Sequence, residues 1–467
     1  MLPKNLKYMN KVESASATAY TSNIAPQNGT GPYGAGQTII INIPTRNNLC
    51  LVGSESTLKF SLTATNGAVG ATTHIRLDRA GANGVIQRLR LYSGSNLLED
   101  IDNYGLLMSN LISLQNSNNY SRGKYNITNG TRSDDYVVGR TTVDPAGFGA
   151  GGDPSIVGRS FTAPAGELLS TVAINNNATT NARTYSISLL SILGTLGSKY
   201  VPLFGMTAGG PLRLELQLVD SPNRFICCNR ALASFSLSNV EYVASFLELS
   251  DNSMEIINQS LMGQPLQYVI PSFRNYVYTQ FLPAGGAQIN VPIASKFSSL
   301  KSLFGVFRDS AKINVATFFP YASAHFGLQN YNLRIGSKII PAKAPSSMPE
   351  FFVEACKAIG SVSDINHSPN MNLFSYDVTT NVANTETTAI NSQTAVSSNF
   401  LIGCDMEVYA NADKESIFSG YNSLNDDIFC QTVFSGTGAD VASMRADFYA
   451  LYDSLLICEN GTAYVKF

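Results

Sequence analysis

Hydrophobic and polar residues alternate after Val85, and the pattern predicts two paired strands followed by a helix. Val85, Leu89 and Leu91 share one face of the first strand, and arginines occupy the other. The turn residues Ser93-Gly94-Ser95-Asn96 then precede a second apolar run at Leu97-Leu98, as in a β-hairpin. The helix that follows has one apolar stripe, for which Asp100 or Asp102 is the expected cap, made of Tyr104, Leu107, Met108, Leu111 and Ile112.

The same pattern returns in the second half of the chain. Residues 331–335 alternate, Gly336-Ser337 supplies a turn, and Ile339-Ile340 resumes the apolar run. Ser347-Met348-Pro349-Glu350 then has the form of a capping box with proline in the first helical turn. Its apolar stripe is Met348, Phe351, Phe352, Ala355 and Cys356. Because the turns lie 242 residues apart and the helices 244, we predict two copies of one domain.

Further strand-like runs fill both halves. In the first half they are 38–43, 56–65, 184–190, 212–218 and 233–247, and in the second 267–281, 287–293, 300–307, 399–409, 428–434 and 444–458. Many short strands with few helices are typical of β-sandwiches. The predicted fold class is therefore all-β, with two tandem eight-stranded jelly-roll β-sandwiches and one helix inserted in each after the fourth strand.

The chain divides into four predicted segments. Residues 1–35 are expected to form an N-terminal arm with no core of its own, basic at Lys4, Lys7 and Lys11. The first jelly roll spans 36–249, a linker helix lies within 250–264, and the second jelly roll spans 265–467. Gly263 and Pro265 are the stop signals of the linker helix. Two Asn/Ser/Thr-rich stretches, 116–181 and 361–398, are expected to be surface excursions.

Charge and composition exclude several classes of function. Charged residues make up only 14% of the chain and the net charge is −2, so no global field favours nucleic acid or anionic lipid. No apolar run reaches the ~18 residues that would indicate a membrane-spanning helix. The N-terminus carries lysines without an apolar core, so no secretory signal is expected. With so few charged residues, the surface of the protein must be formed largely by Ser, Thr, Asn and Gly, or be buried against other copies of the chain.

Seven cysteines offer two interpretations. They lie at 50, 227, 228, 356, 404, 430 and 458, an odd number with no C-x-x-C pair. Reduced, buried thiols made in a cytosol are favoured over a disulfide framework or a zinc site, because several lie inside apolar runs.

Candidate catalytic chemistry is sparse. His74, His325 and His367 each stand alone in the sequence, and the glycines of 204–210 lack the lysine of a phosphate loop. Glu99, Asp100 and Asp102 resemble a glycosidase carboxylate set, but their place before a helix favours a capping role. Asp426-Asp427 lacks the remainder of a calcium loop. We therefore expect no enzyme activity and predict no catalytic, cofactor-binding or metal site.

Two stretches carry a resemblance to a known family. They are Arg88-Leu89-Arg90-Leu91-Tyr92-Ser93-Gly94-Ser95-Asn96-Leu97-Leu98-Glu99-Asp100-Ile101 and the closing run 446–461, ADFYALYDSLLICENG. With two tandem jelly rolls, the chain resembles the double jelly-roll major capsid proteins of double-stranded DNA viruses, and it is most similar to those of virophages and polinton-like viruses.

The resemblance implies a structural role in a virion. Such proteins form homotrimers whose six jelly rolls make a pseudo-hexameric block, and the blocks tile an icosahedral shell. It further implies contacts with penton and minor capsid proteins, outward-facing excursions, an inward-facing arm, and synthesis in the host cytoplasm or virus factory. It implies no specific nucleic-acid site and leaves membrane contact open.

Two alternatives remain at this point. A carbohydrate-binding or carbohydrate-active β-sandwich protein would use the excursions as binding loops, although the chain has no tryptophan and no predicted secretory signal. A minor capsid or fibre component is the other alternative, and the internal duplication counts against it.

Overall fold

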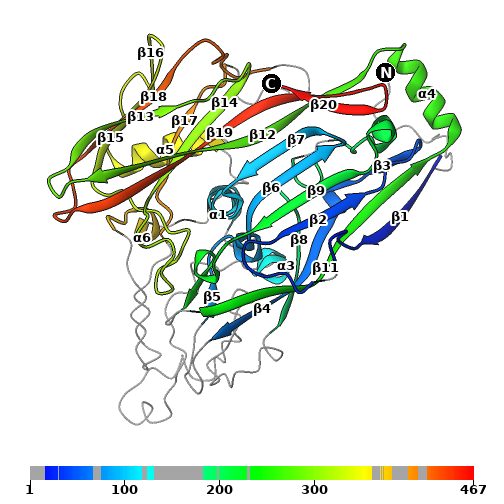
Figure 1. Ribbon diagram of the computed structural model, residues 1–467. Helices are drawn as coiled ribbons and strands as arrows, with labels where there is room; N and C mark the ends of the chain where they lie inside the picture. The colour runs from blue at the N-terminus through cyan, green and yellow to red at the C-terminus, as the bar shows by residue number, and fades with distance from the viewer. Residues whose placement is uncertain are drawn as a thin grey trace, which may run out of the picture.

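The computed structural model describes residues 16–29, 31–66, 75–117, 124–130, 182–196, 199–228, 232–359, 369, 371, 373–380, 398–408 and 418–467. Within these ranges the chain forms two β-sandwiches in sequence, and strands predominate over helices (Figure 1). The lysines predicted for the arm, His74, His367 and most of both excursions lie outside the described residues.

The first sandwich pairs two antiparallel sheets. One has the order β1-β11-β4-β8, made of Ala17–Ile24, Leu232–Leu249, Thr57–Asn66 and Arg183–Ile187. The other has the order β2-β9-β6-β7, made of Thr38–Ile43, Leu212–Leu218, Ile86–Ser93 and Asn96–Asp102. Three short strands complete this half: β3 (Leu49–Leu51) on β11, and β5 (Ile75–Leu77) paired with β10 (Ile226–Cys228).

The second sandwich repeats both orders. Its first sheet is β12-β19-β14-β17, made of Leu266–Leu282, Val441–Glu459, Leu300–Asp309 and Ile402–Asp405. Its second sheet is β13-β18-β15-β16, made of Ala287–Ile293, Ile428–Phe434, Leu328–Ile335 and Lys338–Ile340. Taken in chain order, the eight strands of the two halves occupy equivalent places. The predicted fold, two tandem eight-stranded jelly rolls, is confirmed.

The equivalence corrects the expectation for the N-terminal arm. β1 pairs with β11 over its whole length, as β12 pairs with β19, so β1 is the first strand of its jelly roll. Tyr33 is also buried and bonded to Leu237. The prediction that residues 1–35 lack a core is therefore wrong for this part. Each helix consequently follows the fifth strand of its sandwich rather than the fourth, and deleting residues 1–35 would remove part of the first sheet.

Both predicted hairpins are present. Gly94 lies between β6 and β7 with φ of 59°, and Gly336 lies between β15 and β16 with φ of 56°, values that glycine tolerates best. Helix α1 (Tyr104–Gln115) follows the first hairpin and α5 (Met348–Ile359) the second, which confirms the repeated order of hairpin and helix.

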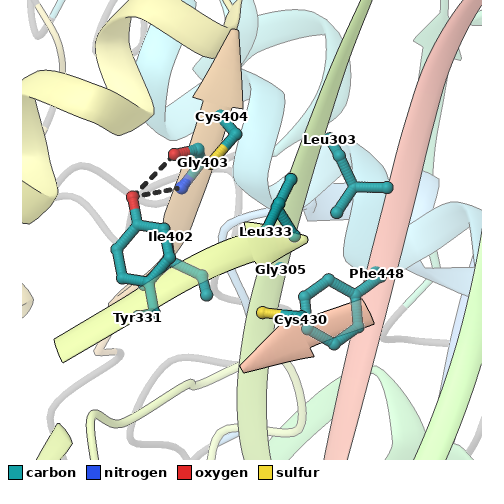
Figure 2. A pocket seen from close by; sticks show the side chains of 9 residues that line it. All are labelled: Leu303, Gly305, Tyr331, Leu333, Ile402, Gly403, Cys404, Cys430 and Phe448. Atoms are coloured by element: carbon teal, nitrogen blue, oxygen red, sulfur yellow. Dashed lines mark hydrogen bonds between the residues drawn. The ribbon is translucent and has the colours of Figure 1, made fainter. Parts of the chain in front are cut away.

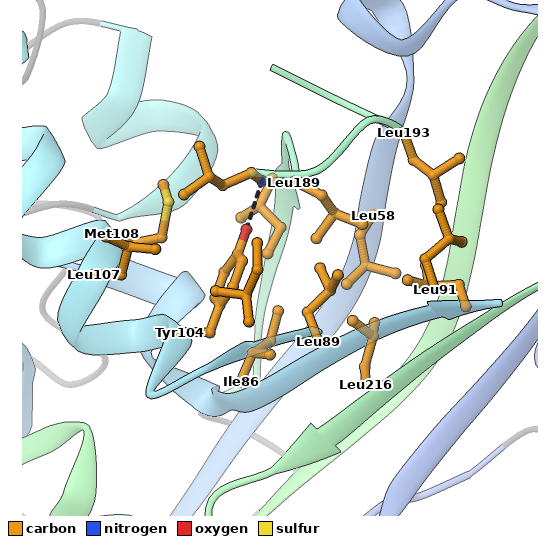
Figure 3. Packing of buried hydrophobic residues seen from close by; sticks show 14 of the residues in the cluster. Leu58, Ile86, Leu89, Leu91, Tyr104, Leu107, Met108, Leu189, Leu193 and Leu216 are labelled. Carbon is orange, nitrogen blue, oxygen red and sulfur yellow. Dashed lines mark hydrogen bonds between the residues drawn. The ribbon is translucent and has the colours of Figure 1, made fainter. Parts of the chain in front are cut away.

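Helix α1 is buried more completely than an amphipathic stripe predicts. Every residue from Tyr104 to Leu114 is buried, including the polar Ser109, Asn110 and Ser113. Figure 3 shows Tyr104 pointing into the first sandwich beside Ile86 and Leu89, with Leu107 next to Met108 on the helix. The opposite side of α1 faces the second half (Figure 1), which the sequence pattern could not indicate.

Helix α5 follows its prediction more closely, with one correction. Glu350 reaches back as in a capping box, but its carboxylate accepts the N–H of Ser346 at 2.7 Å rather than that of Ser347. Phe351 is buried in the second sandwich, whereas Phe352 is half-buried at the boundary between the two cores.

The linker helix α4 (Asp251–Leu261) is confirmed, and Ser250 caps it by accepting the N–H of Ser253 at 3.3 Å. None of its residues is buried. The remaining short helices are α3 (Asn126–Asn129) and α6 (Leu373–Tyr376). Among the described residues, no helix is both long enough and apolar enough to cross a lipid bilayer.

The last strand, β20 (Thr462–Lys466), pairs with β19 at residues 455–459. The equivalent part of β11 pairs with β3, which comes from the connection between β2 and β4. In the second half that connection is shorter, and the C-terminal segment supplies the missing strand. Asn96 donates to the carbonyl of Ala463 at 3.0 Å, so β20 also joins the second half to the first.

Candidate functional site

A buried polar cluster at the seam between the two jelly rolls is centred on Asp447. This β19 residue is fully buried and accepts hydrogen bonds from Arg308 at 2.7 Å, Arg445 at 2.8 Å and Asn103 at 2.8 Å. Burial alone would raise the pKa of Asp447, but the two guanidinium groups outweigh it and hold that pKa below its usual value. Because Asn103 precedes α1, the cluster fixes the first helix to the second sandwich.

A second contact crosses the seam at Tyr321. Its hydroxyl donates to the carbonyl of Gly84 at 2.7 Å, and its N–H donates to Asp78 at 2.7 Å. A Cβ atom on Gly105 would lie only 2.2 Å from the Tyr321 hydroxyl, so α1 needs glycine there. Together with the Asn96–Ala463 bond of β20, these contacts join the two sandwiches by directional hydrogen bonds.

The acidic residues predicted to cap α1 instead have three separate partners. Asp100 forms a bidentate ion pair with Arg88, with both N···O distances 2.7 Å. Asp102 accepts the N–H of Asn103 at 2.8 Å, and Asn103, with φ of 51°, occupies the cap position without a side-chain bond to the helix. The capping interpretation is therefore wrong, because the strand β7 continues through all three acidic residues.

Glu99, the third member of that set, is buried beneath the segment after β8. Its carboxylate accepts a hydrogen bond from Ser191 and the N–H of Ile192 at 3.0 Å. Tyr104 and Tyr242 bond the same segment through the N–H of Leu190 and the carbonyl of Leu193. Burial raises the pKa of Glu99 to about 7, although both of its hydrogen bonds oppose the rise.

This raised pKa predicts a pH-dependent stability. Below about pH 4.5 the carboxyl is neutral in both states. Between about pH 4.5 and 7 it ionises in the unfolded chain but stays neutral in the folded protein, so the stability of the parent falls over this range and not further above it. We expect Glu99→Gln to gain on the order of 3 kcal/mol relative to the parent between pH 5 and pH 8. Thermal unfolding of both proteins at the two pH values checks this. An unchanged difference between them would contradict it.

The remaining candidate residues do not converge. His325 is buried, accepts the N–H of Gly327 at 3.0 Å and lies 3.3 Å from Asp377. Burial lowers the pKa of His325, against the opposing effect of Asp377. Asp427 pairs with Lys296 at 2.9 Å, and Asp426 accepts from Tyr421. Within the described ranges, no three His, Cys, Asp or Glu side chains gather so that they could hold a metal ion.

The cysteines follow the interpretation as buried thiols. Among the cysteines whose side chains the structure describes, five are buried: Cys50, Cys227, Cys404, Cys430 and Cys458. Burial raises the pKa of Cys50 to about 11 and that of Cys458 to about 12, so neither is a thiolate at neutral pH.

Two hollows in the second sandwich differ in size and shape. The first lies between the sheets of the second sandwich, where Figure 2 shows Leu333, Cys430 and Phe448 around it. Its volume of ≈ 10 Å³ and apolar lining suit a packing gap. The second, of ≈ 560 Å³, is an open depression on the outer face of β13, β15 and β18, lined by Asn290, Arg334, Phe429 and Gln431 among others. Neither has the enclosed shape of a small-molecule site.

Several large apolar side chains are exposed on β12, on the linker helix and in the second sandwich. On the edge strand β12, Val277 and Phe281 are 48% and 50% exposed. On and after the linker helix, Ile256 and Met262 are 59% and 87% exposed. The described residues also leave Ile339, Leu424 and Phe429 exposed near one end of the second sandwich. Large contiguous apolar patches mark surfaces that another protein covers, whereas single exposed apolar residues are common on any protein.

Sequence reasoning missed the charged residues that matter most to the interior. Arg308, Arg445 and Asp447 lie on strands whose apolar pattern was the signal used, and Lys301 is another buried charge on β14. Charged residues inside otherwise apolar strand runs are rarely buried without a partner. That rule could have singled out these positions, but not their partners.

Comparisons with known proteins agree with the architecture. No family model and no curated protein matches the sequence. Among solved structures, the chain is similar to the PBCV-1 virus capsid, with 10% identity, a TM-score of 0.59 and coverage of 99% of this chain and 100% of that one.

Two further structures are similar over nearly the whole chain. The Sputnik virophage structure has 12% identity, a TM-score of 0.57 and coverage of 100% and 92%. The mavirus major capsid protein has 11% identity, a TM-score of 0.55 and coverage of 100% and 93%. The chain thus has the double jelly-roll fold of viral major capsid proteins.

Proposed function

We propose that this protein is the major capsid protein of a double-stranded DNA virus and forms pseudo-hexameric homotrimers that tile an icosahedral shell. The observation that carries the proposal is the identical strand order of the two sandwiches, together with the fold that they share with capsid proteins. Two similar sandwiches in each of three copies present six similar edges, which suits six-fold surroundings in a shell.

The seam supports the same role. A building block must transmit contacts on one sandwich to the other, and buried charge pairs hold a single relative orientation when both partners are satisfied. We propose the jelly rolls at 17–249 and 265–467 as the two units, with α4 between them. Their exposed flanks, including β12, would be covered by neighbouring copies in the virion. Penton and minor capsid proteins would be further partners.

Size in solution tests the trimer. Light scattering of the purified full chain should give a mass of three times 50.2 kDa. The trimer should persist in dilute solution, because obligate interfaces bury more than about 2,000 Å² each. A stable monomer at micromolar concentration would contradict the proposal. A Phe281→Glu variant with unchanged thermal unfolding should shift toward monomer if the β12 flank is an interface. Electron microscopy of the assembled material then tests whether closed shells form.

The carbohydrate-related alternative has no specific support among the described residues. The carboxylates that suggested it, Glu99, Asp100 and Asp102, are separated by their different partners. A glycan array and a hydrolysis screen on the same protein test this alternative directly.

A further inference from the structure

We propose that Lys301 and Asp453 form an intramolecular amide cross-link between β14 and β19, with Glu407 as the proton carrier. The Nζ atom of Lys301 lies 3.5 Å from Oδ1 of Asp453 and 3.0 Å from Oε1 of Glu407. The cross-link is independent of the proposed capsid function, since it concerns one sandwich of one chain.

The position of Lys301 comes from an irregularity in the strand pairing. Leu300 pairs with Tyr452 and Ser302 with Leu451, so Lys301 is an extra residue in β14. Bulges of this kind turn a side chain in a direction that the regular strand would not allow. Here the lysine is directed toward the neighbouring strand and is held there by the N–H of Met406, which donates to its carbonyl at 2.8 Å.

The reacting pair is almost removed from water. The side chains of Lys301 and Asp453 are only 6% and 2% exposed, whereas that of Glu407 is 21% exposed. Burial disfavours a charged carboxylate and favours the carboxylic acid. The pKa of Asp453 is raised by its burial, against the opposing effect of Lys301. The neutral pair is the reactive one, because an amine attacks a carboxylic acid and an ammonium group does not.

Ser299 positions the carboxyl group for attack. Its hydroxyl accepts the N–H of Gly420 at 3.1 Å, so its own proton is free to be donated to Oδ2 of Asp453 at 2.8 Å. The N–H of Asp453 donates in turn to the carbonyl of Ser299 at 3.0 Å. Oδ2 therefore has a donor for the charge that develops on it, while Oδ1 remains on the side of Lys301.

The proposed step balances without any further reactant. The amine nitrogen of Lys301 bonds to Cγ of Asp453, and Glu407 accepts the proton that the nitrogen releases. Glu407 then returns this proton to Oδ1, which leaves as water when its bond to Cγ breaks. The products are one amide, one water molecule and the regenerated Glu407 carboxylate. Fixed proximity of the reacting groups supplies the rate, as in other intramolecular reactions.

The first sandwich has no equivalent of the extra residue. Where β4 pairs with β11, both register shifts place the additional residues in β11, and β4 itself has none. The bulge that carries Lys301 is therefore specific to the second sandwich.

Mass spectrometry of the full chain tests the cross-link. The denatured protein should be lighter than its sequence by the mass of one water molecule. After trypsin, peptide 297–308 should be found uncleaved at Lys301 and joined to peptide 446–466. Full sequence mass with separate peptides 297–301, 302–308 and 446–466 would overturn the proposal. A water loss that maps to any other residue would overturn it as well.

Variants assign the roles. Lys301→Arg keeps the positive charge and should restore the full mass, and Glu407→Gln should lose the cross-link while thermal unfolding still reports a folded protein. The matched control is Lys296→Arg. Lys296 also pairs with an aspartate, Asp427, at 2.9 Å, but this pair is exposed to solvent. The Lys296→Arg protein should therefore still be lighter by one water molecule. A Glu407→Gln protein that is linked as completely as the parent would overturn the role given to Glu407.

Discussion

The Asp447→Ala variant is expected to lose about 3–5 kcal/mol of unfolding free energy, the usual cost of removing one partner from a buried ion pair. Asp447 is fully buried between Arg308 and Arg445, so the substitution leaves two guanidinium groups without their carboxylate. It also removes the acceptor of Asn103 and loosens α1 from the second sandwich. Chemical denaturation monitored by tyrosine fluorescence, with the soluble yield recorded, measures the loss.

The matched control is Asp427→Ala. Asp427 also pairs with a cation, Lys296, but both side chains are largely exposed, and such pairs contribute about 0–1 kcal/mol. The two variants remove the same chemical group and differ in burial. Equal losses in both would show that the seam cluster does not hold the two sandwiches together.

The second large effect is expected for Phe351→Ala in α5. Phe351 is 1% exposed and packs against Tyr331 and Phe400 in the second core. Removing a fully enclosed phenylalanine costs about 3–5 kcal/mol, because lost burial and an unfilled cavity add together. Thermal and denaturant unfolding should both show the loss.

Its neighbour Phe352 serves as the control. The apolar stripe in the sequence includes both phenylalanines, but in the structure Phe352 is only half-buried, beside Tyr376. Phe352→Ala should therefore cost clearly less than Phe351→Ala. A larger loss for Phe352→Ala would mean that the boundary between the two cores contributes more to stability than the interior of the second sandwich.

The two halves of the seam could not be matched from the sequence. Asn103 and Asp447 are separated by 344 residues, and Tyr321 and Asp78 by 243. A local pattern records which residues are apolar over a few turns or strand positions, and contains no information on which distant side chain will arrive opposite. Buried polar partners are therefore decided by packing, and Glu99 is the example in which the sequence pointed to a residue but gave it the wrong role.

The strand β1 was missed for a related reason. Its sequence, ATAYTSNI, is mostly polar, and most of its residues are exposed because it lies at the edge of its sheet. Alternation of apolar and polar residues reports burial of one face, which this strand largely lacks. β1 is a strand because its backbone pairs with the much longer β11.

By itself, the sequence determined the all-β class, the duplication, both hairpins, and the positions of α1, α4 and α5. These features depend on residues close together in the chain: turn glycines, apolar periods and helix stop signals. Only the tertiary structure decided that β1 completes the first sandwich, that α1 is enclosed on all sides, and that Asp447 and Lys301 are buried beside their partners. The physical reason is that edge pairing and most contacts of the buried charges come from segments more than about 100 residues away in the chain, which meet only in the folded structure.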